Sequence, residues 1–228
     1  MTDAAIRRGE RALLAHRLDD ELGPFDPVHL AALVDVDRAR FVRPHDVARS
    51  SEDTPFALDD EGHATVSAPH AYLLSFRLLG LARGDRVVEL GSGTGYGAAL
   101  ASWIVGPDGQ VATFEIEPVL ALSARELLSP LPNVRVHEAD AMTSFEHWAG
   151  AERVVCTFAI ETLPDEWIAA MPRAGLLVAP VGPRDKTQRL VRVEMTNDGP
   201  RVTDHGGVRY VPNRGERLGG QRFGGSGA

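Results

Sequence analysis

The chain has 228 residues, of which 43% are hydrophobic, so it can bury one substantial core. Its net charge of −8 argues against a nucleic-acid partner, because phosphate backbones are normally met by a basic face. It has no apolar run of membrane-spanning length, no apolar signal core near its start and a single cysteine, so we expect a cytoplasmic protein without a membrane partner.

The first 70 residues are expected to form a helical cap. Residues 12–22 have a helical pattern, and Asp26 with Pro27 predicts the start of a second helix, since Asp caps and Pro fits the first turn. The polar residues 43–63 are predicted to be a loop. A further helix is expected directly after Ser67, with this serine as its candidate N-cap.

Short β-branched runs then alternate with helical segments. Strands are expected at 86–90, 110–115, 134–137, 153–157 and 176–181, and helices at 97–105, 119–128, 142–149 and 164–171. This alternation predicts an α/β fold, a Rossmann-like, doubly wound, mostly parallel sheet with helices on both faces. Residues 187–195 and 201–211 flank Asn197-Asp-Gly199 and predict a C-terminal β-hairpin. We expect a core over 71–212 and a loosely ordered tail over 213–228.

A glycine-rich turn follows the first of these strands. Glycine occupies positions 91, 93 and 95, where the missing Cβ atoms permit unusual backbone angles and close approach of a ligand to a helix N-terminus. Tyr96 stands where the dinucleotide fingerprint requires glycine, so the spacing is more typical of an S-adenosylmethionine site. The alternative is an ordinary tight turn between strand and helix.

Ligands of such sheets bind beyond the carboxyl ends of the strands. Glu115 ends the second strand, where a carboxylate can accept bonds from both ribose hydroxyls; the alternative is an exposed acid. Asp140 with Ala141 can receive an adenine amino group, or Asp140 can cap the next helix. Thr157 places a small hydroxyl near the path of a transferred group, and Cys156 is expected to be a buried hydrophobe. The histidines lack metal-ligand spacing, so no metal is expected.

Several blocks resemble the protein-L-isoaspartate (D-aspartate) O-methyltransferase family, whose members methylate a misplaced carboxylate of damaged proteins with S-adenosylmethionine. The most diagnostic block is Ala64-Thr-Val-Ser67-Ala-Pro-His70, which is similar to the active-site loop of the family. The remaining blocks are Val36–Val42, Gly84–Tyr96, Asn133–Val136 with Asp140, Gly175 with Val178–Gly182, and Val208–Pro212.

The resemblance implies a role for each matching residue. Ser67 takes the position of the active-site serine, and Ala64, Thr65 and Val66 complete the loop over the methyl donor. For the cofactor it implies that Gly91, Ser92, Gly93 and Thr94 hold the methionine end, that Glu115 and Ile116 hold the ribose, that Asp140 and Ala141 hold the adenine, and that Tyr72 is a further contact.

The chain also departs from the family pattern. Phe158 and Ile160 replace two alanines, and Glu161 replaces a proline, so a narrower acceptor pocket with an extra carboxylate is expected. Residues 57–63 are longer and more acidic than the usual run before the loop. Arg214 and Gly219 stand where some members place a threonine and a glutamine that contact the cofactor. Candidate substrate contacts are Thr157, Phe158, Arg209 and Arg214, the arginines as partners for an acceptor carboxylate.

We therefore expect a methyltransferase that uses S-adenosylmethionine on a carboxylate of a protein or peptide, foremost an L-isoaspartyl residue in protein repair. An already ionised carboxylate needs no general base. The alternatives are the same scaffold acting on another peptide or small molecule in a biosynthetic pathway, and a non-catalytic relative that binds the cofactor or a partner protein. A monomer is favoured.

Overall fold

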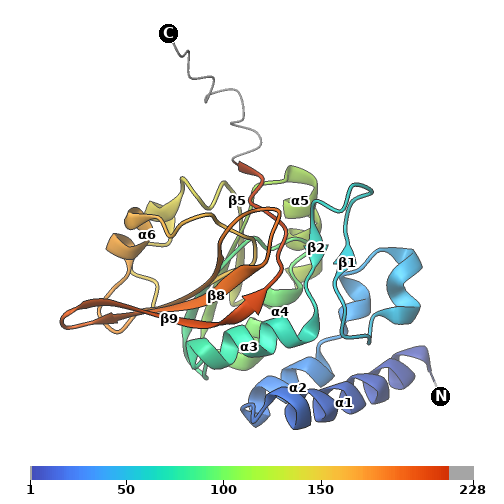
Figure 1. The fold of residues 1–228 in the computed structure, drawn as a ribbon. Coiled ribbons are helices and arrows are strands. Elements are labelled where there is room, and N and C mark those ends of the chain that lie inside the picture. The colour runs from blue at the N-terminus through green and yellow to red at the C-terminus, as the bar shows by residue number, and fades with distance from the viewer. Residues whose placement is uncertain (1, 216–228) are drawn as a thin grey trace.

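The computed structural model describes residues 2–215, and its centre is a seven-stranded sheet in the order β5-β4-β3-β6-β7-β8-β9. Figure 1 shows the long hairpin of β8 and β9 extending to the left of the molecule. The strands are β3 (Arg86–Leu90), β4 (Gln110–Glu115), β5 (Val134–Glu138), β6 (Arg153–Cys156), β7 (Leu176–Val181), β8 (Gln188–Thr196) and β9 (Gly199–Val208). The first five are parallel, and β8 and β9 are antiparallel. Chain order reverses between β3 and β6, which places a ligand crevice at the carboxyl ends of these strands.

Helices cover both faces of the sheet, so the predicted α/β fold is confirmed. On one face lie α3 (Pro69–Leu79), α4 (Tyr96–Val105) and α5 (Pro118–Leu128), whose apolar side chains cluster with Val87 and Val111. On the other lie α6 (Asp165–Ala170) and the 3₁₀ turn η3 (Phe145–His147), where Trp167 packs on Leu90 and Leu177 of the sheet. Alternate strand residues point to opposite faces, so the continuous apolar runs of the sequence serve both clusters.

The N-terminal helices form a third cluster beside α3. Helix α1 (Asp3–Leu22) packs on α2 (Pro27–Asp35) through Leu18 and Leu33. The Asp26 carboxylate accepts from the Val28 amide at 2.9 Å, which confirms the predicted cap. Two 3₁₀ turns, η1 (Arg38–Arg40) and η2 (Pro44–Arg49), and a short ladder of β1 (Phe56–Ala57) with β2 (Thr65–Val66) follow. The stretch predicted to be a loop therefore contains a helical turn and a strand.

The hairpin of β8 and β9 turns at Asn197-Asp-Gly199 as predicted, since Thr196 pairs with Gly199. Two local predictions are wrong. Within 142–149 only one 3₁₀ turn forms. The Asp140 carboxylate accepts from the Met142 amide and the Asp140 carbonyl accepts from the Ser144 amide, so the chain makes a turn here in place of a helix. Helix α3 has Ala68 as its N-cap, so the Ser67 hydroxyl does not cap it.

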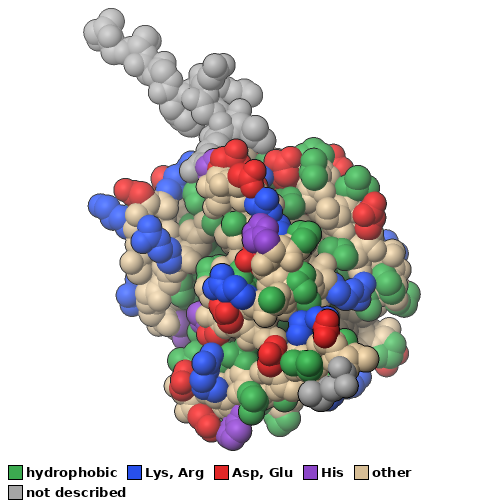
Figure 2. Space-filling model, turned by 90° about the vertical axis from the view of Figure 1, so that its right-hand side faces the viewer, with side chains coloured by type: hydrophobic (Ala, Val, Ile, Leu, Met, Phe, Trp, Pro, Cys, Tyr) green, Lys and Arg blue, Asp and Glu red, His purple; other side chains and the backbone are tan. Residues whose placement is uncertain are grey.

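The face of the molecule in Figure 2 carries Lys and Arg side chains among Asp and Glu side chains, without a continuous basic patch. None of the helices within residues 2–215 is long and apolar enough to cross a membrane.

Candidate active site

A pocket lies at the carboxyl ends of β3, β4, β5 and β6, and we call it the strand-end pocket. Residues from six separate stretches of the chain meet there, in agreement with the topological argument. Its walls are His63, Ala64, Thr65, Gly91, Gly93, Phe114, Glu115, Ile116, Ala139, Asp140, Ala141, Thr157, Phe158, Val211, Pro212, Asn213 and Arg214. The fold thus brings together most of the residues that sequence reasoning singled out, from Ala64 and Thr65 of the loop to the ends of four strands.

The geometry of the turn after β3 requires glycine. Gly91 has φ of 94° and Gly95 has φ of 96°, values that L side chains rarely adopt. A Cβ at Gly91 would lie 2.6 Å from the hydroxyl oxygen of Thr157, and one at Gly95 would lie 2.6 Å from a methyl carbon of Leu128. The glycines therefore allow β6 and α5 to approach the turn, in addition to leaving main chain exposed to the pocket.

Glu115 is buried at the floor of the strand-end pocket, so the alternative of an exposed acid is wrong. One carboxylate oxygen accepts from the Gly93 amide at 2.7 Å, and the other accepts from the Glu117 amide at 3.0 Å. Burial raises the pKa of Glu115, and these two backbone donors limit that rise. Each oxygen keeps a second acceptor site, which suits a pair of vicinal hydroxyls.

Asp140 performs the turn role and still faces the pocket. Its Oδ1 accepts from the Met142 amide at 2.9 Å. Its other oxygen faces Gly215, where a Cβ would overlap the carboxylate. Ala139 and Ala141 on either side line the pocket without filling it, which leaves room for a flat ring.

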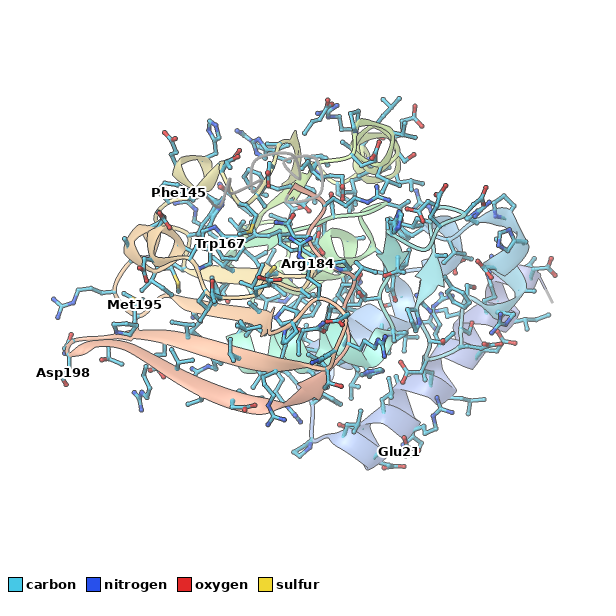
Figure 3. All side chains as sticks on the ribbon, turned by 45° about the horizontal axis from the view of Figure 1, so that its top comes forward. Glu21, Phe145, Trp167, Arg184, Met195 and Asp198 are labelled. Carbon is cyan, nitrogen blue, oxygen red and sulfur yellow. The ribbon has the colours of Figure 1, made fainter. Side chains whose placement is uncertain are left out.

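A second cavity of about 850 Å³ adjoins the first, and we call it the Ser67 cleft. Its walls come from the end of α1, the start of α3 and residues 207–212, and Thr65, Val211 and Pro212 line both cavities. Among its polar side chains are Ser67, His70, Arg184 and Arg209. In Figure 3 Arg184 lies far from Asp198, which marks the distal tip of the β8–β9 hairpin.

Asp53 holds His70 at the wall of the Ser67 cleft. The His70 ring nitrogen Nδ1 lies 2.9 Å from Asp53 Oδ2, and the His70 amide donates to the same carboxylate at 3.0 Å. Burial alone would raise the pKa of Asp53, but the bonds from His70 hold this pKa below its usual range. The imidazole is thereby fixed in orientation, with Nε2 as its second polar atom.

Comparison with known proteins decides the family. Residues 15–218 match the family model of protein-L-isoaspartate(D-aspartate) O-methyltransferase. A curated protein-L-isoaspartate O-methyltransferase of Archaeoglobus fulgidus is 37% identical over 211 residues, which are 91% of this chain and 94% of that protein. One of Anaeromyxobacter dehalogenans is 36% identical, over 80% of this chain and 87% of that protein. The chain belongs to this family.

Solved structures agree on the fold. A structure named protein-L-isoaspartate O-methyltransferase superposes with a TM-score of 0.81 at 21% identity, covering 94% of this chain and 69% of that one. A Plasmodium falciparum protein described by the same activity, solved in complex with S-adenosyl-L-homocysteine, gives 0.76 at 20% identity, over 89% of this chain and 97% of that one. The predicted family, its methyltransferase activity and its cofactor S-adenosylmethionine are thereby confirmed.

The residues of this family member fit an adenosyl group. Glu115 offers acceptors for the ribose hydroxyls, Asp140 offers one for the adenine amino group, and the alanines beside it leave room for the ring. Phe158, predicted as a substrate contact, lines this pocket rather than the Ser67 cleft, whereas Ile160 is buried in the core and narrows neither.

Four predicted cofactor residues line neither cavity. Val66 and Tyr72 are buried, and the Tyr72 ring packs edge-on against Tyr96 at 5.5 Å. Thr94 donates its hydroxyl to the Phe41 carbonyl at 2.6 Å. Ser92 is buried, and its hydroxyl has no partner within residues 2–215. Their contacts with the cofactor stay predictions.

Glu161 and Arg214, two charged residues that depart from the family pattern, do not lie in the acceptor pocket where they were expected. The Glu161 carboxylate is 61% exposed and pairs with Arg184 at 3.5 Å, so it adds no wall to either cavity. Arg214 pairs with Asp59 and, at 3.1 Å, with Glu117, so it stays at the strand-end pocket, and Arg209 is the predicted arginine that reaches the Ser67 cleft. Gly219 lies outside the described residues.

Sequence reasoning assigned no role to Arg38, Glu89 or Asn213. Arg38 lies in a block that resembles the family, and its position in that block was the available signal. Glu89 interrupts an apolar strand, which marks it as a buried acid. No sequence pattern marked Asn213 as a candidate site residue, because its place in the pocket wall depends on contacts with residues far away in the chain.

Glu89 predicts a pH-dependent stability. Its carboxyl is buried beneath α4 and accepts from the Thr113 hydroxyl at 2.7 Å, and burial raises its pKa to about 8. Between the unfolded pKa near 4.5 and the folded value, only the folded state keeps this proton. The free energy of unfolding should therefore fall as pH rises, by about 1.4 kcal/mol per pH unit from this group.

The test compares Glu89→Gln, which cannot titrate, with the wild type in urea unfolding at pH 5, 6.5 and 8. We expect the variant to gain stability relative to the wild type as pH rises across this window. Glu126→Gln, an exposed substitution on α5, serves as the control. Parallel pH profiles for Glu89→Gln and the wild type would contradict the raised pKa.

Proposed function

We propose that this chain transfers the methyl group of S-adenosylmethionine to the side-chain carboxylate of an L-isoaspartyl residue in a protein or peptide. The observation that carries the proposal is the adjoining of the two cavities, which share Thr65, Val211 and Pro212. One cavity suits the adenosyl group, and the other opens beside Ser67 for a peptide. A buried free thiol at Cys156 supports a reducing, cytoplasmic compartment.

The chemistry requires alignment rather than proton transfer. When bound, the cofactor supplies a methyl group already activated by its sulfonium. The acceptor carboxylate is ionised at pH 7, so no base has to remove a proton. The protein then has to bring the acceptor oxygen into line with the methyl group and exclude water, a contribution of about 7–11 kcal/mol at best.

The residues of the two cavities divide these tasks. Glu115 would hold the ribose and Asp140 the adenine amino group, which fixes the cofactor. Ser67 would donate its hydroxyl to the acceptor carboxylate and orient it. Arg209 supplies positive charge at the cleft wall, and His70, fixed by Asp53, supplies a second polar group.

Matched peptides test the proposal. A peptide with one L-isoaspartyl residue and its aspartyl isomer are each incubated with methyl-labelled S-adenosylmethionine, and the base-labile ester is counted. We expect label on the isoaspartyl peptide and at most 1% of that rate on the isomer, on the order of the discrimination that binding contacts provide. Equal labelling of both would contradict isoaspartyl specificity, and label on neither would favour a different acceptor.

Ser67→Ala is expected to lower kcat about 10- to 100-fold on the isoaspartyl peptide, because one hydrogen bond to a charged acceptor is worth about 1.5–3 kcal/mol. The Kd of S-adenosylhomocysteine, measured by calorimetry, should stay within about threefold, since Ser67 lines the cleft and not the strand-end pocket. Ser129→Ala, at the exposed end of α5, is the matched control. Loss of cofactor affinity in Ser67→Ala would instead make this serine a cofactor or folding residue.

A further inference from the structure

Residues 211–215 form a strap over the strand-end pocket. The strap runs beside the segment after β6: the Ala159 amide donates to the Val211 carbonyl at 2.8 Å, and the Asn213 amide donates to the Ala159 carbonyl at 3.1 Å. Pro212 forms a parallel bridge with Ala159. The backbone of the strap is therefore fixed by the segment that follows β6, and its side chains have defined positions in the pocket wall.

Arg214 ties the strap to two other segments of the chain. Its guanidinium pairs with Asp59 of the 57–63 loop and, at 3.1 Å, with Glu117 at the start of α5. The donors of Arg214 are thus used by carboxylates of two other segments of the protein. The neighbouring residue, Asn213, is thereby held in place.

Asn213 carries a polar group that the protein itself does not satisfy. The residue is 4% exposed and lines the strand-end pocket. Its Oδ1 accepts from the Gly215 amide at 2.9 Å, and this bond fixes which end of the amide is nitrogen. The Nδ2 group is buried and has no partner among the described residues. Buried donors are almost always paired, so an unpaired one in a pocket wall points to a ligand acceptor.

We infer that Asn213 Nδ2 donates a hydrogen bond to a ring nitrogen of the adenine, and that it selects for this base. The inference rests on the strand-end pocket being the cofactor site. Gly215, bonded to the Asn213 side chain, lies against the Asp140 carboxylate, so the amide belongs to the adenine side of the pocket. Asp140 accepts from the exocyclic amino group, and an N–H donor complements the ring nitrogens, which only accept.

Two variants separate ligand binding from folding. Asn213→Asp keeps an oxygen for the Gly215 amide and replaces the donor by an acceptor, and Asn213→Leu removes the donor without adding charge. Calorimetry with S-adenosylhomocysteine should show a Kd raised about 5- to 20-fold in Asn213→Leu, and more in Asn213→Asp, while both ligand-free variants still unfold in a single cooperative thermal transition. Asn197→Asp, in the β8–β9 turn, is the control for the change in charge.

Analogues of S-adenosylhomocysteine identify the accepting atom. Replacing adenine N1, N3 or N7 by carbon, one at a time, should weaken binding to the wild type for one of the three, with no further loss for that analogue in Asn213→Leu. A Kd within twofold of the wild type in Asn213→Leu would overturn the inference, as would equal losses for every analogue in both proteins. If the wild type does not bind S-adenosylhomocysteine at all, the cofactor site itself is wrong; binding that is indifferent to Asn213 overturns only this inference.

Discussion

Glu115→Ala is expected to weaken S-adenosylhomocysteine binding at least about 100-fold. Hydrogen bonds to a charged group are worth about 1.5–3 kcal/mol each, and the carboxylate can accept two from the ribose, so a loss of about 3 kcal/mol is a conservative value. The substitution also removes the acceptor of the Gly93 and Glu117 amides, which hold the glycine turn and the start of α5 at the pocket.

Calorimetry measures the Kd, and ligand-induced shifts in melting temperature check it independently. Glu115→Gln keeps the shape and one acceptor, so we expect an intermediate loss. Glu138→Ala is the matched control, because Glu138 also ends a strand but is half exposed and pairs with Arg125 at 3.1 Å. A Kd for Glu115→Ala within threefold of the wild type would remove Glu115 from the ribose role.

The sequence predicts the sheet well because local chemistry determines it. The predicted bounds 86–90, 110–115 and 176–181 coincide with β3, β4 and β7, since their apolar runs end at glycine or at an acidic residue. The location of the strand-end pocket could be predicted for the same reason, because ligands of such sheets bind at strand ends and strand ends can be located in the sequence. Glu115 and Asp140 needed no tertiary information beyond this rule.

The remaining features depend on contacts that no local pattern contains. The helix expected at 142–149 does not form, because the side chain and the carbonyl of Asp140 accept hydrogen bonds from the amides that follow and hold them in a turn. Glu161 was assigned to the acceptor pocket from its position in a motif, but its side chain turns outward to Arg184. Asn213 is placed in the pocket wall by its hydrogen bonds with Ala159 and Gly215, and Arg214 is placed by acids that are more than 90 residues away in the chain.

Two segments of the chain form the boundary between the two cavities. Thr65 of β2 and the pair Val211-Pro212 line both, and each belongs to a segment pinned by buried hydrogen bonds. In the proposed reaction the methyl group crosses this boundary, so the position of its residues would set the alignment of donor and acceptor. The residue that holds the β2 side of this boundary is Arg38.

Arg38→Met is expected to lower the free energy of unfolding by about 4 kcal/mol and to lower kcat more than cofactor affinity. The Arg38 side chain is 1% exposed, and its guanidinium lies 4.6 Å from the centre of the Phe56 ring. It donates to five backbone carbonyls, those of Ser50, Glu52, Thr54, Val66 and Ser67. Met can fill the space but leaves these carbonyls without a donor, and each buried polar group left unpaired costs about 1–3 kcal/mol.

The effect on kcat follows from the position of these carbonyls. Two of them belong to Val66 and Ser67, so Arg38 fixes the backbone that positions the Ser67 hydroxyl at the cleft. Glu115 ends β4 and Asp140 follows β5, and the hydrogen bonds of Arg38 go to neither strand. Three measurements test this. Urea unfolding gives the loss of stability, limited proteolysis reports on the order of residues 50–67, and kcat is compared with the Kd of S-adenosylhomocysteine. Arg38→Lys should recover part of the stability, because an ammonium carries three donors where the guanidinium carries five. Arg40→Met, exposed on the same 3₁₀ turn, is the control; if Arg38→Met unfolds and is cleaved like Arg40→Met, then Arg38 does not organise the loop.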